Sequence, residues 1–529
     1  MRAPFVSAVA MGLAVAGCVG PFDVTSATDD VTSAAGSEYT IEFDSFVYVS
    51  RGASDGDVRE AIRRQVKSAL GALRERGIGV LDRDAERNLA RGDWRRAPVD
   101  VVAGGEVVDR LDRVTYRYRD TAIVAHGAAA ESPVSLTLLA GDYAARRDDL
   151  VPDCTDDPDA EADSLWYHFH PGRSACRRRI ARERDAINAA MESLDDPSAQ
   201  ISTADRDRLF VTTVAALTPV DGVGDTYPEY DRLWGFAGDP SRAKVVVYAF
   251  FGVDRDEADP RDWGLREFLR FERTLRARFP ELRVVHTDPF AMLLDFWIDG
   301  AKVDGVTFDD VERWVLDGTG FPPAAASPAA RDALLAQVVE RFSERWIVWQ
   351  LPVTVDLDGA TRDMTVEIRT YYGYEDGSWE ARQRATWRYL EAFWHADVFA
   401  YTGHSHFGHG PLAPFGYRTD NFPWRYQVML INSCLSFNYY DQDFIDMHPG
   451  GADNLDVVVN GLAAYWAGMG EATARYVIGL IDGEGKTWRE LLASMRVDLP
   501  WVRAYDPLRA VNGERGNRFA GGALRVSPR

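Results

Sequence analysis

The feature that most constrains the fold is the segment from Lys244 to Gly252, which is apolar almost throughout. A strand with one solvated face alternates apolar and polar residues, and this segment shows no such alternation. Leu265 to Phe279 then has apolar residues at helical spacing, and Leu282 to Thr287 has the composition of a second strand. Unbroken apolar strands separated by a helix are typical of a parallel sheet that is covered on both faces. The sequence therefore predicts an α/β fold with a mainly parallel sheet flanked by helices.

The chain is long enough for more than one hydrophobic core, and its pattern changes along its length. Residues 38–150 alternate strand-like and helix-like stretches and are expected to form a smaller α+β domain. Residues 151–207 form a connector. Residues 208–529 form the α/β domain, which begins with a strand at 209–217. Within that domain we also expect a β-hairpin inserted beside the sheet (346–372), a helix (379–394), strands (397–402 and 427–432), a solvated acidic loop (437–446) and helical material (456–480).

The first 17 residues are expected to form a secretory signal peptide. Arg2 is followed by an apolar run from Phe5 to Val15, which is too short to span a bilayer, and small residues precede Cys18. This arrangement resembles the lipobox of bacterial lipoproteins, in which the cysteine receives the lipid and becomes the new N-terminus. The resemblance implies lipidation at Cys18, a place in the bacterial cell envelope, and a flexible tether over 18–37. An ordinary secretory signal is the alternative.

From the charge of the chain, no nucleic-acid partner is expected. The formal net charge of −22 comes from 82 acidic and 60 basic residues, and no basic stripe is interleaved with aromatic residues. After the signal there is no apolar run long enough to cross a membrane, so membrane contact is expected only through the N-terminal lipid. Gly485 to Thr487 lacks the earlier glycine of a phosphate loop, and no cofactor is expected.

Three cysteines remain once Cys18 is assigned. Cys154 and Cys176 lie close together in the sequence, and outside the cytosol two such cysteines most often form a disulfide. A zinc site built from them with His168 and His170 is the alternative, although its spacing fits no standard pattern. Cys434 is then left as a lone thiol, which is either buried and inert or retained for chemistry.

Two predicted strands end with residue types that a cysteine nucleophile requires. The strand at 397–402 is followed by Gly403 and His404, and the strand at 427–432 is followed by Ser433 and Cys434. The carboxyl ends of parallel strands open on one edge of the sheet, where ligands bind in open α/β folds. Both side chains are therefore expected to meet at that edge.

These residues resemble the caspase-like clan of cysteine peptidases, and the gingipain branch most closely. In that clan an apolar strand that ends in His-Gly supplies the base, and a later strand that ends in a small residue and cysteine supplies the nucleophile. The resemblance covers about residues 240–500. One residue departs from it, because Ser405 follows His404 where the clan usually has glycine.

The resemblance implies cleavage of a peptide or protein substrate by a Cys434–His404 dyad. His404 would lower the pKa of the thiol and later protonate the leaving amine. Backbone N–H groups at the two strand ends would bind the oxyanion, with Gly403, Ser405, Ser433 and Ser436 lining the site.

Two other functions use the same residues. His404, His406 and His409 have the spacing of a zinc hydrolase, although the aspartate of that pattern is replaced by Gly408. Alternatively, the chain retains a peptidase-like fold without activity and serves as a surface-binding lipoprotein, in which case Cys434 is a buried apolar residue.

Overall fold

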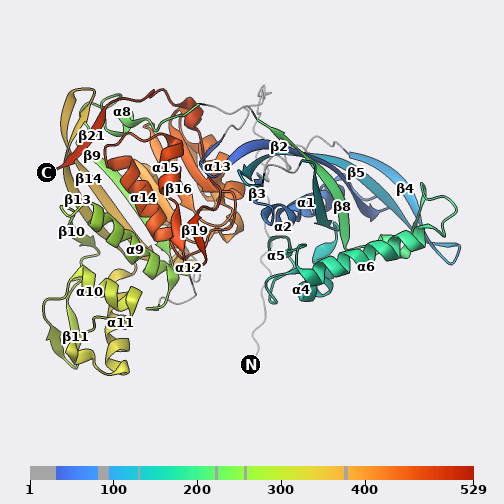
Figure 1. Ribbon diagram of the computed structural model, residues 1–529, viewed down its shortest axis with the longest axis horizontal. Coiled ribbons are helices and arrows are strands. Elements are labelled where there is room, and N and C mark those ends of the chain that lie inside the picture. Colours follow the sequence, from blue (N-terminus) through green and yellow to red (C-terminus); the bar gives the residue numbers. More distant parts are fainter. Residues whose placement is uncertain (1–30, 81–93, 129–131, 221–223, 255–258, 375–378) are drawn as a thin grey trace.

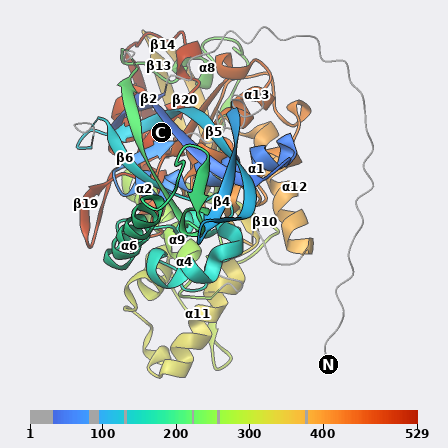
Figure 2. The same ribbon diagram turned by 90° about the vertical axis from the view of Figure 1, so that its right-hand side faces the viewer.

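The computed structural model describes residues 31–80, 94–128, 132–220, 224–254, 259–374 and 379–529, with only the backbone for 379–382. Within these residues the protein is a mixed α/β protein with a ten-stranded and a seven-stranded sheet. The ten-stranded sheet and its helices lie on the left in Figure 1, and the seven-stranded sheet lies on the right. Figure 2 looks onto the right-hand side of that view, with the smaller sheet in front.

Five neighbouring parallel strands form the centre of the ten-stranded sheet. The strands of this sheet are β1 (Thr32–Ser33), β9 (Lys244–Gly252), β10 (Arg283–Asp288), β13 (Arg345–Leu357), β14 (Ala360–Gly373), β15 (Val398–Thr402), β16 (Gln427–Asn432), β17 (Leu455–Asn460), β20 (Arg509–Asn512) and β21 (Leu524–Pro528). The parallel strands follow the order β14-β9-β15-β16-β17. β20 and β1 extend one side, β13 and β10 extend the other, and β21 pairs with β13, all in antiparallel fashion.

Helices cover both faces of this sheet, as the unbroken apolar strand predicts. Val247 and Phe251 of β9 point into a core formed with α9 (Trp263–Arg278), α14 (Met469–Ile481) and α15 (Trp488–Ser494). Tyr248 and Phe250 point to the opposite face and pack with α12 (Trp379–His395) and α13 (Ser436–Met447). Because both faces are buried, every position along such a strand can be apolar.

Three segments of this region differ from the sequence prediction. The hairpin of β13 and β14 is present and turns at Asp358 and Gly359, both with positive φ, but it lies within the sheet because β14 pairs with β9. Residues 456–480 begin with strand β17 and become helical only at Met469. A short apolar run that is buried on both faces has no periodicity to separate strand from helix. Residues 437–446 form most of the amphipathic helix α13 and are not a solvated loop.

The seven-stranded sheet is mainly antiparallel and has the order β6-β8-β2-β5-β4-β7, with β3 beside β5. Its strands are β2 (Gly36–Ser50), β3 (Ile78–Val80), β4 (Trp94–Ala103), β5 (Glu106–Ala125), β6 (Val134–Leu139), β7 (Gln200–Ser202) and β8 (Phe210–Pro219). Helices α1 (Asp55–Lys67) and α2 (Ala69–Arg74) pack on it, and Val58, Ile62 and Val66 of α1 recur at helical spacing in the shared core.

Two expected boundaries do not match the strand pairing. The strand at 209–217 was expected to open the α/β region, whereas β8 pairs with β2 and β6 in the smaller sheet. Its alternating burial is that of a strand with one solvated face. Thr32 and Ser33, which fall in the expected tether, pair with Val511 and Ala510 and are buried. Residues 18–30, including Cys18, lie outside the described residues.

A disulfide-closed segment connects β6 to β7. Cys154 ends α4 (Arg147–Cys154), and Cys176 lies in the first turn of α6 (Ser174–Met191), with α5 (Leu165–His168) between them. The disulfide between these two cysteines confirms the predicted pairing and rules out a zinc site built from their thiolates. The apolar cluster around the disulfide includes Leu435, the residue after Cys434, so this segment packs against the ten-stranded sheet.

The other α-helices and strands flank or connect these sheets. They are α7 (Thr203–Arg206), α8 (Tyr230–Leu233), β11 (Phe296–Ile298), β12 (Ala301–Val303), α10 (Phe308–Glu312), α11 (Pro328–Phe342), β18 (Val497–Leu499) and β19 (Val502–Tyr505). β11, α10 and α11 project below the large sheet in Figure 1. In the part of the chain that the structure describes, no helix has the length and apolarity required to span a bilayer.

Candidate functional site

His404 and Cys434 follow neighbouring parallel strands at the same level of the sheet. Thr402, the last residue of β15, is paired with Asn432, the last residue of β16. Each candidate residue stands two positions beyond its strand end, so both lie at the carboxyl edge. After β9 the chain forms β10, β13 and β14 on one side of that strand and then crosses to β15 on the other side, which makes this edge a topological switch point.

A buried polar network fixes the strand ends beneath the two residues. Asn432 donates to Thr473 Oγ1 over 3.1 Å, and Asn460, at the end of β17, donates to Asn432 Oδ1 over 3.0 Å. Thr402 Oγ1 lies 2.9 Å from Thr473 Oγ1. These side chains are fully buried and hydrogen-bond one another, which holds the ends of β15, β16 and β17 in register.

The His404 ring is held by Asp254 and by Trp466. Its Nε2 lies 3.2 Å from the Asp254 carbonyl oxygen and 3.5 Å from Asp254 Oδ1. The ring meets Trp466 edge-on with centroids 5.3 Å apart, and 44% of the side chain is exposed. Asp254 stands two residues after β9, so the histidine and the carboxylate come from the two strands that flank the switch point. A carboxylate in this position orients an imidazole and stabilises its charged form.

Cys434 is half-buried, and its thiol donates to the Ala464 carbonyl oxygen over 3.3 Å. The Tyr167 side chain borders the same cavity as the thiol. Burial raises the pKa of the Cys434 thiol above its ordinary value, whereas the sequence led us to expect a lowered pKa. In this arrangement the thiol is protonated at neutral pH.

Strained backbone surrounds both residues. His406 and Phe407, which follow His404, have φ values of 47° and 51°, and Leu435, which follows Cys434, has a φ of 52°. Bulky residues rarely adopt this left-handed conformation, and such strain concentrates at functional sites.

A cavity of about 490 Å³ adjoins Cys434 and is lined by helices and loops of both sheet regions. The ten-stranded region contributes Cys434, Leu462 to Tyr465 and Tyr505 to Pro507. The other wall comes from α2 and the disulfide-closed segment and includes Arg74, Tyr167 and His170. No pattern in the sequence indicates that these residues lie beside Cys434.

The expected lining residues have different surroundings. Gly403 and Ser405 are buried, and the Ser405 carbonyl oxygen accepts from the Tyr440 hydroxyl. The Ser433 carbonyl oxygen accepts from Asn460 Nδ2. The Ser436 hydroxyl donates to the Ile431 carbonyl oxygen and accepts from the Asn460 N–H, both over 2.7 Å. Ser436 therefore ties β16 to β17 at the start of α13.

The three histidines of the zinc alternative do not gather around one point. The rings of His404 and His406 are 5.7 Å apart, and His409 lies beside the exposed ring of Phe415. Among the residues that the structure describes, no group of three or more His, Cys, Asp or Glu side chains is placed to hold a metal ion.

Sequence reasoning missed two residues of the site. Asp254 had a detectable signal, because it is the first polar residue after the apolar strand β9 and stands at the same edge as His404. Tyr167 had none, because it comes from a segment far from Cys434 in the sequence and reaches the site only through tertiary packing.

Comparisons with protein-family models, curated proteins and solved structures find no match to this chain.

Proposed function

We propose that this chain is a cell-envelope lipoprotein that cleaves peptide bonds with a caspase-like cysteine peptidase site. The observation that carries the proposal is the pairing of Thr402 with Asn432, which sets His404 and Cys434 at equivalent positions on adjacent parallel strands. Both residues also contact the loop after β17, Cys434 through Ala464 and His404 through Trp466. The substrate is a peptide or protein, and no metal or other cofactor takes part.

The reaction begins when the thiol turns from Ala464 and transfers its proton to His404. Because Asp254 holds Nε2, Nδ1 is the nitrogen that exchanges the proton. The thiolate attacks the substrate carbonyl carbon, and backbone N–H groups at the two strand ends stabilise the oxyanion. His404 then protonates the leaving amine and leaves a thioester on Cys434. A water molecule, deprotonated by His404, hydrolyses the thioester and restores the thiol.

Cleavage of a peptide library by the full-length protein tests this proposal. Cys434→Ala and His404→Ala should each lower the rate by several powers of ten, because residues that act as a unit fail together. His409→Ala is the matched control, because its ring lies beside Phe415, and it should retain most of the rate. Thermal unfolding of each variant checks that the fold is intact. Undiminished cleavage by Cys434→Ala would exclude the cysteine mechanism.

The lipid anchor is tested separately. Cys18→Ala should move the protein from the detergent phase to the aqueous phase, since a lipoprotein is retained by its several acyl chains. Equal partitioning of the variant and the parent protein would contradict lipidation at Cys18.

A catalytically inactive surface-binding lipoprotein is the second candidate. The observation that favours it is the raised pKa of the Cys434 thiol, which lowers the fraction of thiolate at neutral pH. A thiol-directed probe separates the two functions. Slow labelling of Cys434 that is unaffected by His404→Ala, together with no peptide cleavage, would support the binding protein.

A further inference from the structure

The Cys434 site contains a side chain from outside the ten-stranded sheet. Tyr167 lies on α5, within the segment closed by the disulfide, and lines the same cavity as Cys434, where its hydroxyl acts to lower the pKa of the thiol. The thiol itself donates to the Ala464 carbonyl oxygen. The surroundings of the sulfur therefore include a hydroxyl group from the smaller sheet region and a carbonyl acceptor from the larger one.

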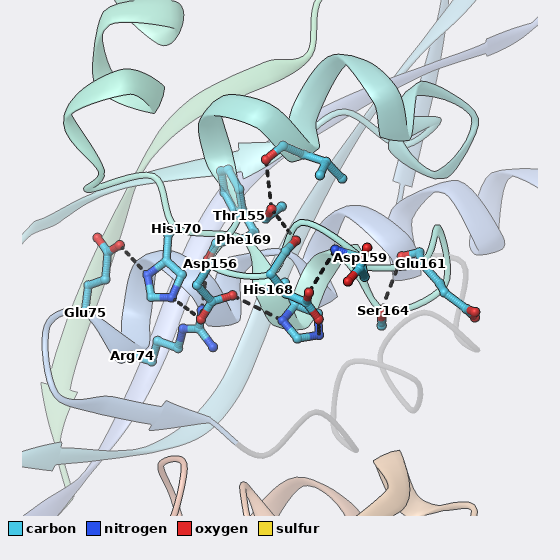
Figure 3. A network of polar contacts seen from close by, with 12 residues as sticks. Arg74, Glu75, Thr155, Asp156, Asp159, Glu161, Ser164, His168, Phe169 and His170 are labelled. Carbon is cyan, nitrogen blue, oxygen red and sulfur yellow. Dashed lines mark hydrogen bonds and ion pairs between the residues drawn. The ribbon is translucent and has the colours of Figure 1, made fainter.

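A chain of charged contacts fixes the segment that carries Tyr167, as Figure 3 shows. His170 bridges two carboxylates, with Nδ1 3.1 Å from Glu75 Oε1 and Nε2 2.7 Å from Asp156 Oδ2. His168 Nδ1 lies 3.1 Å from Asp156 Oδ1. Glu75 directly follows α2, so the network ties the disulfide-closed segment to the core of the smaller sheet.

Arg74 joins this network and lies behind the Tyr167 ring. Its guanidinium stacks over that ring at 5.6 Å, lies 3.7 Å from Asp156 Oδ2 and donates to the Phe169 carbonyl oxygen over 3.5 Å. This cation faces the same cavity as Cys434. The charged groups around the sulfur thus include a guanidinium, whose field favours a thiolate.

Aromatic contacts place the same segment against the loop that follows His404. The rings of Trp166 and Tyr167 meet Phe407 edge-on at 5.9 and 5.2 Å. Tyr167 therefore lines the cavity of the cysteine and packs on the loop of the histidine. A ring that packs against Phe407 and lies under the Arg74 guanidinium has little freedom to move away from this cavity.

We propose that Tyr167, supported by Arg74, belongs to the active site and stabilises the Cys434 thiolate by donating a hydrogen bond to the sulfur. This inference rests on the nucleophilic role of Cys434 proposed above. The proton leaves Sγ for His404, while the Tyr167 hydroxyl keeps its own proton and forms a charge-assisted hydrogen bond to the thiolate. The smaller sheet region is thus a part of the catalytic site and does not merely cover it.

The electrostatics of the sulfur agree with this role. Burial raises the pKa of the Cys434 thiol, and the Tyr167 hydroxyl and the Arg74 guanidinium act in the opposite direction. Burial also raises the pKa of the Tyr167 hydroxyl far above its ordinary value, so the phenol remains a donor when the thiol ionises. Without Tyr167 the thiol would be still harder to ionise.

The test measures the rate of iodoacetamide alkylation of Cys434 against pH in the Cys18→Ala full-length protein. With Cys154 and Cys176 joined, Cys434 is then the free thiol of the chain. Tyr167→Phe retains the ring and removes the donor. Its midpoint should shift upward by about one pH unit, which slows alkylation about tenfold below the midpoint. Tyr143→Phe is the matched control, because Tyr143 is buried in the same apolar cluster and should leave the midpoint unchanged.

Arg74 provides an independent variant. Arg74→Gln should also raise the midpoint, and Arg74→Lys should restore most of it, which loss of packing alone would not do. The inference would be overturned by an unchanged midpoint in Tyr167→Phe, by faster alkylation in that variant, or by a Cys434 that no variant makes reactive. The disulfide-closed segment would then only shield the Cys434 site from solvent. Alkylation requires no substrate. A shifted midpoint without any peptide cleavage would therefore uphold the role of Tyr167 and refute the peptidase.

Discussion

The two large sheets bury their side chains in different ways. β16, in the parallel centre of the ten-stranded sheet, is buried at every position, whereas β8 of the smaller sheet alternates between buried and exposed positions. In the first sheet a polar residue cannot occur within a strand without a partner, so polar residues collect at the strand ends. In the second sheet polar residues occur along the whole solvated face. Candidate functional residues are therefore easier to recognise from the sequence at the edge of the first sheet.

The residues buried against the large sheet include an ionisable one. Glu272 on α9 is fully buried against the large sheet, where its Oε1 accepts from Thr370 Oγ1 over 2.8 Å and from Trp349 Nε1 over 3.0 Å. Burial raises its pKa to about 8. The carboxyl is thus uncharged in the folded protein at neutral pH, and stability should depend on pH through this side of the molecule.

The largest expected effect is that of Glu272→Gln on this pH dependence. The folded pKa lies above the ordinary value, so the stabilisation by the neutral carboxyl is complete below the unfolded pKa and is lost as pH rises toward 8. The glutamine does not ionise. The free energy of unfolding of the variant relative to the parent should therefore increase between pH 5 and 8.5, by on the order of 4 kcal/mol. Urea unfolding at several pH values measures it.

Glu281→Gln is the control for this experiment, because Glu281 is exposed and its substitution should give a flat difference. A flat difference for Glu272→Gln as well would show that this carboxylate is solvated in the folded state, and the contrast in burial between the two sheets would lose its electrostatic consequence.

The second effect concerns the smaller sheet region. Replacing Cys154 and Cys176 together by serine opens a loop with a sequence separation of 22 and should lower the free energy of unfolding by about 3 kcal/mol. Hydrogen exchange should show the loss in α6 and β8, with β9 and β16 unchanged, since the disulfide lies outside the parallel sheet. Equal loss of protection in both sheets would mean that the two regions unfold as one unit.

The sequence predicted correctly those segments whose residue pattern is compatible with only one structure. β9, β16 and the disulfide were predicted correctly, because a run that is buried on both faces and a pair of neighbouring cysteines have few alternatives. β17 was predicted as helix because its apolar run has neither the helical nor the strand periodicity. β8 was assigned to the wrong region because the residues of one strand do not indicate which other strands it pairs with.

The residues of the candidate site also fall into those that the sequence could predict and those that it could not. His404 and Cys434 were placed at one edge because each follows a buried strand, and the strand register agrees with that placement. Asp254 was within reach of the same reasoning. Tyr167 and Arg74 were not, because a contact between residues more than 260 positions apart depends on how the two sheets pack, which no local pattern records.

The smallest expected effects come from two glycines at close helix contacts, one in each region. A Cβ at Gly470 on α14 would lie 1.9 Å from the Glu267 carbonyl oxygen of α9, and a Cβ at Gly71 on α2 would lie 2.1 Å from the Phe169 carbonyl oxygen. Both distances are too short, so each alanine variant must displace its neighbour. Gly470→Ala should cost about 2 kcal/mol, because two helices packed on the large sheet cannot separate locally.

Gly71→Ala should cost less, about 1 kcal/mol, because the neighbour of Gly71 is a short connecting segment and not a second long helix, so it can be displaced at the expense of its side-chain contacts. That shift has a second consequence, since Phe169 is two residues from Tyr167. The alkylation midpoint of Cys434 should rise in Gly71→Ala, as is expected when the Tyr167 hydroxyl is removed, and should stay unchanged in Gly470→Ala despite the larger loss of stability. Urea unfolding and alkylation of both variants measure the two effects. If the change in the alkylation midpoint were proportional to the loss of stability in both variants, the midpoint would depend on the overall packing of the protein and not on the position of Tyr167.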